Sequence, residues 1–453
     1  MESLSDSPKI HKKSPSQDCS VDVVHHDKTY FVQAVDKLDN NTEIALKKLG
    51  PNTPCYCYFE EKLTESAKTL MSYKTPFGLT VRYAMKANSN KAILQLLEKQ
   101  GLWIDSSSVN ECYRAQAAGI PVHKISLTTQ EVPSSEQLED LILKKGIHYN
   151  ASSLLQLENF GKLCPEREVG LRVNVGIGSG SFKRTTTGGK GVSFGVFEQQ
   201  AEIDRILEEY KLKLTTIHLH IGSGADPELQ KQAAKKVLEV AELYPTVTTL
   251  SLGGGYKVRR VQADKQTSIE VLSKATSEEL LAFEKRTKRR IHLEIEPGTY
   301  AVALSGYIVA KIIDIVSTGK GGYKFLKIDS GMTEAMRIPL YGAQHPMYLI
   351  PMDSTPRTNK SYIVVGSCCE TGDIMTPAPG MPEEIQARLL LEAKVGDLLI
   401  IGACGAYCSS MSPSNYNSHT IPAEYMVRKN GSIQMIRKKQ NLEDLWRLEV
   451  DLC

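Results

Sequence analysis

Short β-rich runs alternate with helical patterns between about residues 78 and 298 of the chain. The intervening segments carry helix signals: Asn90 can cap residues 91–99, Ser134 and Gln137 form a capping box, and residues 228–244 repeat apolar positions at spacings of three and four. The runs predict eight strands, at residues 81–86, 102–105, 124–128, 147–151, 169–175, 216–221, 248–252 and 291–296. Eight parallel βα units in about 220 residues favour a closed (β/α)8, TIM-like barrel over a doubly wound open sheet.

The pattern changes after residue 300 to short β-type runs separated by Gly, Pro and Asn turns, with examples at residues 307–316, 361–365, 397–401 and 423–427. We therefore expect a barrel over residues 59–300 and a second, mostly β domain over residues 301–453. Residues 29–58 are expected to join this β domain. Residues 1–28 are polar and lack an apolar segment, so a disordered N-terminal arm is expected there.

The charges of the chain nearly cancel, with 55 Lys and Arg against 52 Asp and Glu. This balance gives no reason to expect nucleic acid or a membrane surface as a partner and favours a small molecule. The longest apolar runs fall well short of the roughly 20 residues that span a bilayer. The ten cysteines do not follow zinc spacings, and without a secretory signal they indicate a reduced, cytoplasmic setting with no metal site.

Polar residues and glycines gather at the C-terminal ends of the predicted strands, which is the rim where such barrels carry their chemistry. The set is Lys86, Asp105, Arg172, His218, His220, Gly253, Gly254, Gly255, Glu296 and Gly298. Lys86 follows an apolar run directly, a position that suits a Schiff-base lysine, because a partly desolvated amine is nucleophilic near neutral pH. A solvated lysine at a strand end is the alternative interpretation.

The three consecutive glycines can expose backbone N–H groups to an anion, although a tight turn explains them equally well. Ser223 adds a hydroxyl after His220, which strengthens the prediction of a phosphate site. His218 and His220 are two residues apart, so both imidazoles are predicted to lie on one side of a strand. A metal pair would need further ligands that the sequence does not supply. An imidazole packed on a cofactor ring is therefore favoured.

Glu294 and Glu296 alternate with apolar residues, so both are predicted to face the barrel interior, where a carboxylate needs a partner. A protonated heteroaromatic nitrogen would suit Glu296, and Arg172 is a candidate neighbour. A lysine, an anion cradle, a flat imidazole and a buried carboxylate together indicate a site for pyridoxal 5'-phosphate (PLP).

Residues 50–430 resemble the barrel-fold (fold type III) PLP decarboxylases, which include ornithine, arginine and diaminopimelate decarboxylases. The barrel motifs that carry the resemblance are YAMKAN at residues 83–88, HLHIGS at 218–223, GGG at 253–255 and EPG at 296–298. The resemblance implies that Lys86 forms the Schiff base, His220 stacks on the cofactor, and Glu296 faces its pyridine nitrogen. Ser223 and the three glycines would then meet the phosphate. Further cofactor-lining positions are matched by Asp105, Arg172 and Gly298.

The second domain carries matching motifs. CCETGD at residues 368–373 is similar to the CESGD-type motif of diaminopimelate decarboxylases, in which the cysteine matching Cys369 reaches into the neighbouring subunit's site. The resemblance thus implies a homodimer with shared active sites, a catalytic Cys369 and a substrate-binding Glu370. Tyr407 matches a tyrosine at the phosphate and substrate, and Arg337 with Tyr341 matches a substrate-binding pair. Because ornithine decarboxylases usually carry Asp at position 370, the glutamate favours diaminopimelate.

Three positions depart from the family pattern. Thr299 stands where the family usually has an arginine that serves a phosphate or a substrate carboxylate, so one cationic anchor is absent. Ser367 replaces a proline, and Ser251 replaces an aspartate before the glycines. Lys183 and Arg184, in a basic loop after the fifth strand, are candidate substitutes for the absent arginine.

The resemblance implies a carbon–carbon lyase that decarboxylates meso-2,6-diaminopimelate to L-lysine and CO2. Decarboxylation of ornithine, D-lysine or a carboxylated polyamine by the same fold remains an alternative. A barrel-fold racemase is another, against which the pair Cys369 and Glu370 argues. A non-catalytic regulatory homologue that binds a partner protein is the last, and the retention of Lys86, Glu296 and Cys369 argues against it.

Overall fold

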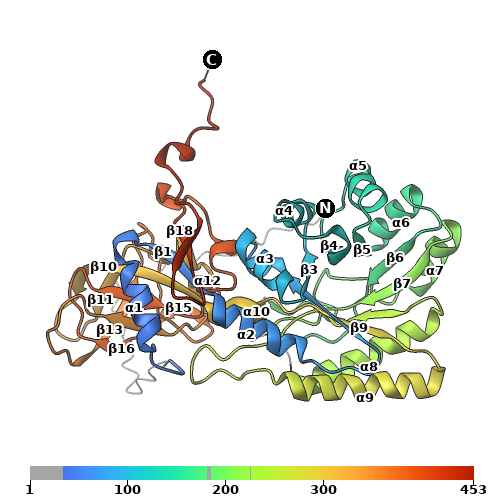
Figure 1. Cartoon of the computed structure of the whole chain (residues 1–453), viewed down its shortest axis with the longest axis horizontal. Helices are drawn as coiled ribbons and strands as arrows, with labels where there is room; N and C mark the ends of the chain where they lie inside the picture. Colours follow the sequence, from blue (N-terminus) through green and yellow to red (C-terminus); the bar gives the residue numbers. More distant parts are fainter. Residues whose placement is uncertain (1–33, 181–184, 225, 453) are drawn as a thin grey trace, which may run out of the picture. The chain divides into compact units, whose positions relative to one another are not determined.

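The computed structural model describes residues 34–180, 185–224 and 226–452, so the arm predicted over residues 1–28 lies outside the described residues. The predicted strands form a closed parallel barrel, which confirms the fold class (Figure 1). Around the barrel they are β2 (Leu79–Ala84), β3 (Trp103–Ser106), β4 (Ile125–Thr128), β5 (His148–Ala151), β6 (Glu168–Arg172), β7 (Lys213–His218), β8 (Thr249–Ser251) and β9 (His292–Ile295). β2 pairs with β9, Leu79 opposite Leu293, and this pairing closes the ring.

Helices lie on the outside of the barrel (Figure 1). They are α2 (Glu60–Met71), α3 (Lys91–Lys99), α4 (Val109–Ala117), α5 (Ser135–Leu138), α6 (Leu154–Leu163), α7 (Gln200–Glu209), α8 (Pro227–Leu243), α9 (Ile269–Thr287) and α10 (Thr299–Val302). The Asn90 side chain caps α3 by accepting the Ala92 N–H at 2.9 Å, and Ser134 with Gln137 forms the predicted capping box of α5. After α5 the chain continues in a π-helical turn, Glu139–Lys144, where a continuous α-helix was expected.

The apolar stripes of these helices are buried against the strands. Leu94 and Leu97 of α3 and Ala233 and Val237 of α8 are fully buried in one core cluster with the barrel strands. Burial of a leucine side chain contributes about 1.5–3 kcal/mol, so this layer holds the strand ends in fixed relative positions. In the described part of the chain, every helix is too short or too polar to pass through a lipid bilayer.

An ion pair lies inside the barrel, as the alternation at Glu294 predicted. Arg82 Nε and Nη2 each donate to one carboxylate oxygen of Glu294 at 2.8 Å, and both side chains are buried. The guanidinium also lies over the Trp103 ring, 4.9 Å from its centroid. Burial alone would raise the pKa of Glu294, but the charge and hydrogen bonds of Arg82 hold that pKa below its ordinary value. The Glu294 carboxylate therefore stays ionised at neutral pH.

We expect Arg82→Met to lower the free energy of unfolding by about 3–5 kcal/mol, because the Glu294 carboxylate would remain buried without its cation. The matched control is the double variant Arg82→Met with Glu294→Leu, which should recover most of the lost stability because no charge is left unpaired. Urea denaturation of both variants and the wild type measures the difference. Equal stability of the single and double variants would contradict the assignment of the loss to an unpaired carboxylate.

A second sheet contains nine strands (Figure 1). They are β1 (Cys55–Phe59), β10 (Gly306–Ser317), β11 (Lys324–Ile328), β12 (Met347–Ile350), β13 (Asn359–Val365), β16 (Arg388–Leu391), β17 (Leu398–Ile401), β18 (Ala423–Val427) and β19 (Ile433–Arg437). The hairpin of β14 (Pro377–Ala378) and β15 (Met381–Ile385) is separate, and the helices here are α1 (Asn40–Lys48), α11 (Met332–Ala335) and α12 (Arg337–Tyr341). β1 precedes the barrel in sequence yet pairs with β10 and β18, which follow it.

Candidate active site

The polar residues predicted for the site lie at or just beyond the C-terminal ends of the barrel strands. Lys86 lies in a 3-10 turn, Met85–Ala87, that follows β2, so it is not part of the strand as predicted. Asp105 lies in β3, Arg172 ends β6, and Glu296 follows β9 directly. Because all eight strands are parallel, these ends meet at one rim, as the sequence analysis expected.

Lys86 has an exposed side chain whose Nζ donates to Ser107 Oγ at 3.0 Å. Desolvation of the amine would lower the pKa of Lys86, but the acidic groups of Asp105, Tyr407 and Glu296 outweigh this effect and raise the pKa above its ordinary value. This direction is opposite to the one expected for a desolvated lysine. In this state the amine is a cation held among acidic groups, and it becomes nucleophilic only when it loses a proton.

Glu296 is held by two side chains from neighbouring strands. His218 Nε2, at the end of β7, lies 3.0 Å from Glu296 Oε2, and Ser251 Oγ, on β8, donates to Oε1 at 2.8 Å. Burial would raise the pKa of Glu296, but His218, the Ser251 hydrogen bond and the charge of Lys86 hold it well below the ordinary value. The carboxylate is therefore ionised at neutral pH. Arg172, the neighbour expected from the sequence, acts on it only electrostatically.

Asp105 is the second carboxyl group of this region. Burial and then the charge of Glu296 raise its pKa to about 8. Two carboxylates that interact strongly in a buried site do not both ionise easily, so one holds the charge and the other the proton. With its partners His218 and Ser251, Glu296 is the ionised member, and Asp105 is the member that holds its proton more strongly.

His220 and the three glycines form the next part of the rim. Strand β7 ends at His218, so only one of the two predicted imidazoles lies on a strand, although the Leu219 N–H still donates to the Ser251 carbonyl at 2.9 Å. His220 Nδ1 accepts the Gly254 N–H at 3.2 Å. Burial and the charges of Arg172 and Lys86 lower the pKa of His220 well below its ordinary value, so the imidazole is neutral. Within the described residues, no cluster of His, Cys, Asp and Glu has the composition of a metal site.

The glycine turn has no room for side chains. Gly253 and Gly255 have φ of +63° and +103°, which favours glycine. A Cβ on Gly254 would lie 2.5 Å from the Glu296 carbonyl oxygen. Backbone N–H groups can therefore approach a bound group closely at this turn.

Arg172 and Ser223 lie on the same part of the rim. The Arg172 guanidinium is buried over the Phe194 ring, 4.7 Å from its centroid, and burial lowers the pKa of Arg172 to about 10, so it stays charged. Ser223 Oγ donates to Thr185 Oγ1 at 2.7 Å. Lys183 and Arg184, the candidate substitutes for the arginine absent at position 299, lie outside the described residues.

The β domain reaches the barrel rim through the segment around Tyr407. The Tyr407 N–H donates to the carbonyl of Ala87 at 2.8 Å, and Asn88 Nδ2 donates to the carbonyl of Gly405 at 3.2 Å, so this segment is bonded to the residues beside Lys86. A Cβ on Gly298 would lie 3.3 Å from the Tyr407 hydroxyl, so that hydroxyl lies over Gly298. Tyr407 is thereby placed next to Lys86 and Thr299.

Arg337 and Tyr341 are the two ends of α12, and Arg337 acts electrostatically on Tyr407. Arg337 is buried, and its Nη1 lies 2.6 Å from His345 Nε2. His345 Nδ1 donates in turn to the Gly402 carbonyl at 2.8 Å. Burial and the charges of Arg337 and Arg260 lower the pKa of His345 well below its ordinary value, so the partner of Arg337 is a neutral imidazole.

Cys369 and Glu370 are the predicted residues that the single chain does not bring to the rim. Both are exposed; the Cys369 N–H donates to Asn417 Oδ1 at 2.7 Å, and Glu370 Oε2 accepts the Tyr416 hydroxyl at 3.1 Å. The adjacent Cys368 is different, because burial and the charge of Asp373 raise its pKa to about 12. Cys369 and Glu370 are therefore presented outward by a hydrogen-bonded loop.

Sequence analysis did not assign a role to two residues of the site, His218 and Ser251. The only available signal was the alternation of side chains, which points both into the barrel beside Glu296. The two residues are opposite each other in the β7–β8 pairing, and Ser251 is also opposite Glu294 of β9. Glu296 lies two residues beyond Glu294, and its carboxylate reaches both His218 and Ser251.

The residues present fit PLP. An aldehyde cofactor with an anionic phosphate and a basic ring nitrogen needs an amine, N–H donors without side chains in the way, and an ionised carboxylate. Lys86, the glycine turn at residues 253–255, where no side chain blocks the approach of a bound group, and Glu296 supply these groups at one rim.

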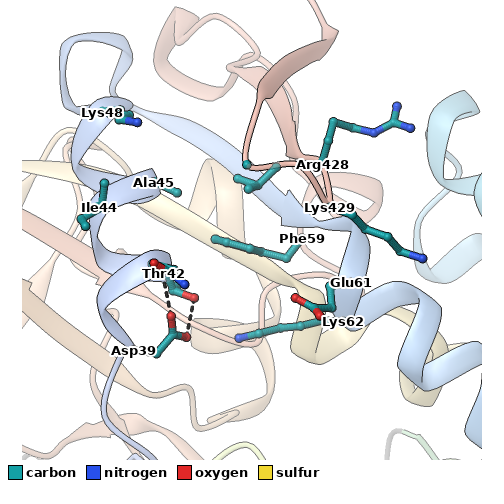
Figure 2. Close-up of a pocket in the computed structure, with 13 residues that line it drawn as sticks. Asp39, Thr42, Ile44, Ala45, Lys48, Phe59, Glu61, Lys62, Arg428 and Lys429 are labelled. Carbon is teal, nitrogen blue, oxygen red and sulfur yellow. Dashed lines mark hydrogen bonds between the residues drawn. The ribbon is translucent and has the colours of Figure 1, made fainter.

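Apart from the barrel rim, a hollow of about 510 Å³ lies between α1, the start of α2 and the turn after β18 (Figure 2). Asp39 caps α1 there and accepts the Thr42 N–H at 2.8 Å, and Lys62 Nζ lies 5.5 Å from the centroid of the Phe59 ring. The described residues that line it include no member of the set predicted for the site. Its charged groups serve the helix start and the packing of Lys62, so the barrel rim is the candidate active site.

Comparison with known proteins identifies the family of the chain. Residues 61–303, more than half of the chain, match the pyridoxal binding domain of the pyridoxal-dependent decarboxylases. Diaminopimelate decarboxylase of Buchnera aphidicola subsp. Acyrthosiphon pisum (strain APS) is 33% identical over 416 residues, which cover 90% of this chain and 96% of that protein. A crystal structure of diaminopimelate decarboxylase has a TM-score of 0.82 at 30% identity and covers 92% of this chain and 99% of its own. The Helicobacter pylori enzyme complexed with L-lysine has a TM-score of 0.78 at 28% identity and covers 89% and 98%.

Proposed function

The chain belongs to the pyridoxal-dependent decarboxylases, and on this premise we propose that it converts meso-2,6-diaminopimelate to L-lysine and CO2. The observation that carries the proposal is the placement of Lys86 and an ionised Glu296 at one rim, with the buried cation Arg337 beside Tyr407. A decarboxylase needs the first two groups for its cofactor, and a substrate with a distal carboxylate needs the third. The relative from Helicobacter pylori was solved with L-lysine, the product of this reaction.

PLP, the cofactor of this family, would be held by residues of the barrel and of the β domain. Lys86 would attach it covalently, and His220, as a neutral imidazole, would pack on its ring. Its phosphate would be bound by Ser223, the N–H groups of the glycine turn and the Tyr407 hydroxyl. The remaining residues proposed around it are Asp105, Arg172, Gly298 and Glu296. The burial of Asp105, Arg172 and Glu296 supports these roles, and so does the convergence of the whole set on one rim.

When bound, PLP supplies the electron sink that stabilises the negative charge left at Cα as CO2 departs. Glu296 would keep a proton on the ring nitrogen, which suits a carboxylate whose pKa is lowered by His218, Ser251 and Lys86. Lys86 would orient the reacting group and carry its proton. Tyr407, fixed by its backbone bond to Ala87, would close the site against water.

We also propose that the enzyme is a homodimer with shared active sites. Cys369 and Glu370 face outward on a loop fixed by Asn417 and Tyr416, which suits residues that complete the site of a second subunit. There the partner subunit's Cys369 would return a proton to Cα, and the partner subunit's Glu370 would bind the distal amine. Arg337 and Tyr341 would bind the substrate from within the chain. A cytoplasmic location is proposed with this, because the eight cysteines among the described residues are unpaired.

Cys369→Ala is expected to lower turnover by about 10²-fold or to divert it to side products, since a positioned proton donor contributes at least this much. The visible absorbance of the bound cofactor should persist, because Lys86 is unchanged. The matched control is Cys368→Ala, which replaces the neighbouring thiol and should leave turnover near the wild-type value. Unchanged turnover and products in Cys369→Ala would remove Cys369 from the mechanism.

Mixing subunits tests the shared site directly. Lys86→Ala and Cys369→Ala are each expected to be impaired alone, but a mixed dimer contains one site with both residues intact. Recovery of activity after the two variants are mixed and exchanged supports a site built from two subunits. Without any recovery in a dimer that demonstrably exchanges, each site would be complete within one chain.

The proposed reaction is tested by measuring CO2 release from meso-2,6-diaminopimelate, ornithine, D-lysine and a carboxylated polyamine. Highest kcat/KM with diaminopimelate and formation of L-lysine are expected. A higher value with another substrate would reassign the enzyme within the same fold. No release from any of them, together with no visible absorbance of bound cofactor, would favour a non-catalytic homologue.

A further inference from the structure

Arg260 is a half-buried cation that the proposed mechanism has not used. It lies in the loop between β8 and α9, five residues after the glycine turn. Its backbone N–H donates to Asp264 Oδ2 at 3.1 Å, which fixes the loop, while its guanidinium Nε and Nη2 are sealed from solvent and have no hydrogen-bond partner among the described residues. Buried N–H groups of a guanidinium are costly when unpaired, so these two atoms mark the place of an absent acceptor.

Arg337 also lacks a hydrogen-bond acceptor for part of its guanidinium. Its Nη1 is bonded to the neutral His345, and its buried Nε has no hydrogen-bond partner in the described part of the chain. In the described ranges, neither Arg260 nor Arg337 has a carboxylate within ion-pair distance. Neither guanidinium therefore has a directly bonded counter-ion among the described residues, and Asp264 attracts Arg260 only electrostatically.

The two guanidinium groups act on each other and on the same loop. Burial and then the charge of Arg337 lower the pKa of Arg260 to about 9, so Arg260 remains protonated at neutral pH. The positive charges of both arginines also act electrostatically on Cys404 and Cys408, which flank Tyr407 in sequence. Two like charges side by side in a buried place are unfavourable unless an anion lies between them.

Arg260 and Arg337 lie at the rim of the proposed site. Arg337 acts electrostatically on Tyr407, as does Lys86, and the Tyr407 hydroxyl lies over Gly298. Thr299 is the next residue and offers no charge. The loop that carries Arg260 also contacts this segment, because Gln266 Nε2 donates to the Tyr300 hydroxyl at 3.4 Å.

We propose that Arg260 and Arg337 together bind the distal carboxylate of the substrate, with Arg260 supplying the cation that Thr299 does not. The inference rests on the proposed function. A carboxylate offers about four acceptor positions and is matched by guanidinium N–H groups in pairs. The three unpartnered nitrogen atoms of the two arginines carry four N–H bonds, which suit such a group. A phosphate already has its donors at the glycine turn.

The product of the proposed reaction separates this role from others. Loss of CO2 from one end of diaminopimelate leaves L-lysine, which retains the distal carboxylate, whereas cadaverine has the same carbon chain and both amines but no carboxylate. Binding of these two ligands to the holoenzyme therefore isolates the contribution of the carboxylate. The variants are Arg260→Gln, Arg260→Lys and the control Arg259→Gln, whose side chain is exposed and donates to the Gln262 carbonyl.

For Arg260→Gln we expect L-lysine to bind about 10- to 100-fold more weakly, as when a charged hydrogen bond is lost, with cadaverine unchanged. The KM for diaminopimelate should rise with little change in kcat, and the absorbance of the bound cofactor should persist. Arg260→Lys should recover part of the affinity, because it keeps the charge but not the planar fork. Arg259→Gln should bind both ligands as the wild type does.

Three results would overturn the inference. One is unchanged L-lysine affinity in Arg260→Gln. Another is an equal loss for L-lysine and cadaverine, which would indicate a structural role. The third result applies if Arg260→Gln does not fold. It is an unchanged affinity for L-lysine in the folded Arg260→Lys variant. Failure of the proposed function is distinguishable, because the wild type itself would then neither release CO2 from diaminopimelate nor bind L-lysine.

Discussion

Lys86→Ala is expected to abolish turnover, with a loss of about 10⁴-fold or more, the scale seen when a covalent nucleophile is removed. Lys86 is the residue placed among Asp105, Glu296 and Tyr407, and its Nζ is the amine that would attach the cofactor. No other side chain of the site supplies an amine in the described part of the rim. Turnover is measured as CO2 release from diaminopimelate.

Covalent attachment is a separate readout for the same variant. After borohydride reduction and denaturation, the wild-type chain should retain the mass of the cofactor, and Lys86→Ala should not. The matched control is Lys91→Ala, which replaces an exposed lysine in the first turn of α3 and should retain both mass and turnover. Retention of the cofactor mass by Lys86→Ala would place the attachment at another lysine.

The barrel could be predicted from the sequence because buried parallel strands and amphipathic helices leave regular patterns. The ends of the strands could not be fixed in this way. Lys86 lies in a 3-10 turn because residues outside the local pattern bond the backbone there: Ala84 N–H donates to Pro297 O at 3.3 Å, and Tyr407 N–H donates to Ala87 O. These bonds join segments that are more than 200 positions apart, so no local pattern encodes them.

The same limit applies to the site. Asp105 and Glu296 could be placed at the rim because each ends or follows a predicted strand. The bonds of Glu296 to His218 and Ser251 depend on the register of three strands, which is set by the closed barrel. The proximity of Arg260 and Arg337 depends on the packing of the β domain against a barrel loop, so the sequence alone left both without a joint role.

Cys369 shows a limit of a different kind. Its predicted role came from the resemblance alone, and within one chain it contacts Asn417 and not the barrel rim. A residue that completes the site of another subunit leaves no intrachain contact by which it can be recognised. Its exposure is the physical feature that agrees with the prediction.

Glu296→Gln is expected to lower turnover by about 10²–10³-fold, the loss typical when one preorganised electrostatic group is removed. The cofactor should remain attached, because Lys86 is intact, and His218 and Ser251 can still bond an amide. Ser251→Ala is the milder comparison, because it removes only one hydrogen bond from the carboxylate. Unchanged turnover in Glu296→Gln would show that the reaction does not need a charge at this position.

The pH dependence of stability tests the ionisation of Glu296 in the cofactor-free protein. The pKa of Asp105 is raised from 3.8 to about 8, so the folded protein keeps a proton that the unfolded chain releases, and stability is lost as the pH rises through this window. The pKa of Glu296 is lowered, so its contribution is present above its ordinary pKa and is lost as the pH falls below it. Glu296→Gln removes the charge that raises the pKa of Asp105.

Urea midpoints measured from pH 5 to pH 8 should therefore fall less steeply in Glu296→Gln than in the wild type. Burial of Asp105 is the larger cause of its shift, so part of the slope should remain, and Asp105→Asn should remove it. Equal slopes in Glu296→Gln and the wild type would mean that no charge on Glu296 acts on Asp105. Glu296 would then not be the ionised carboxylate that a protonated ring nitrogen requires. Another group would have to stabilise the proton on that nitrogen.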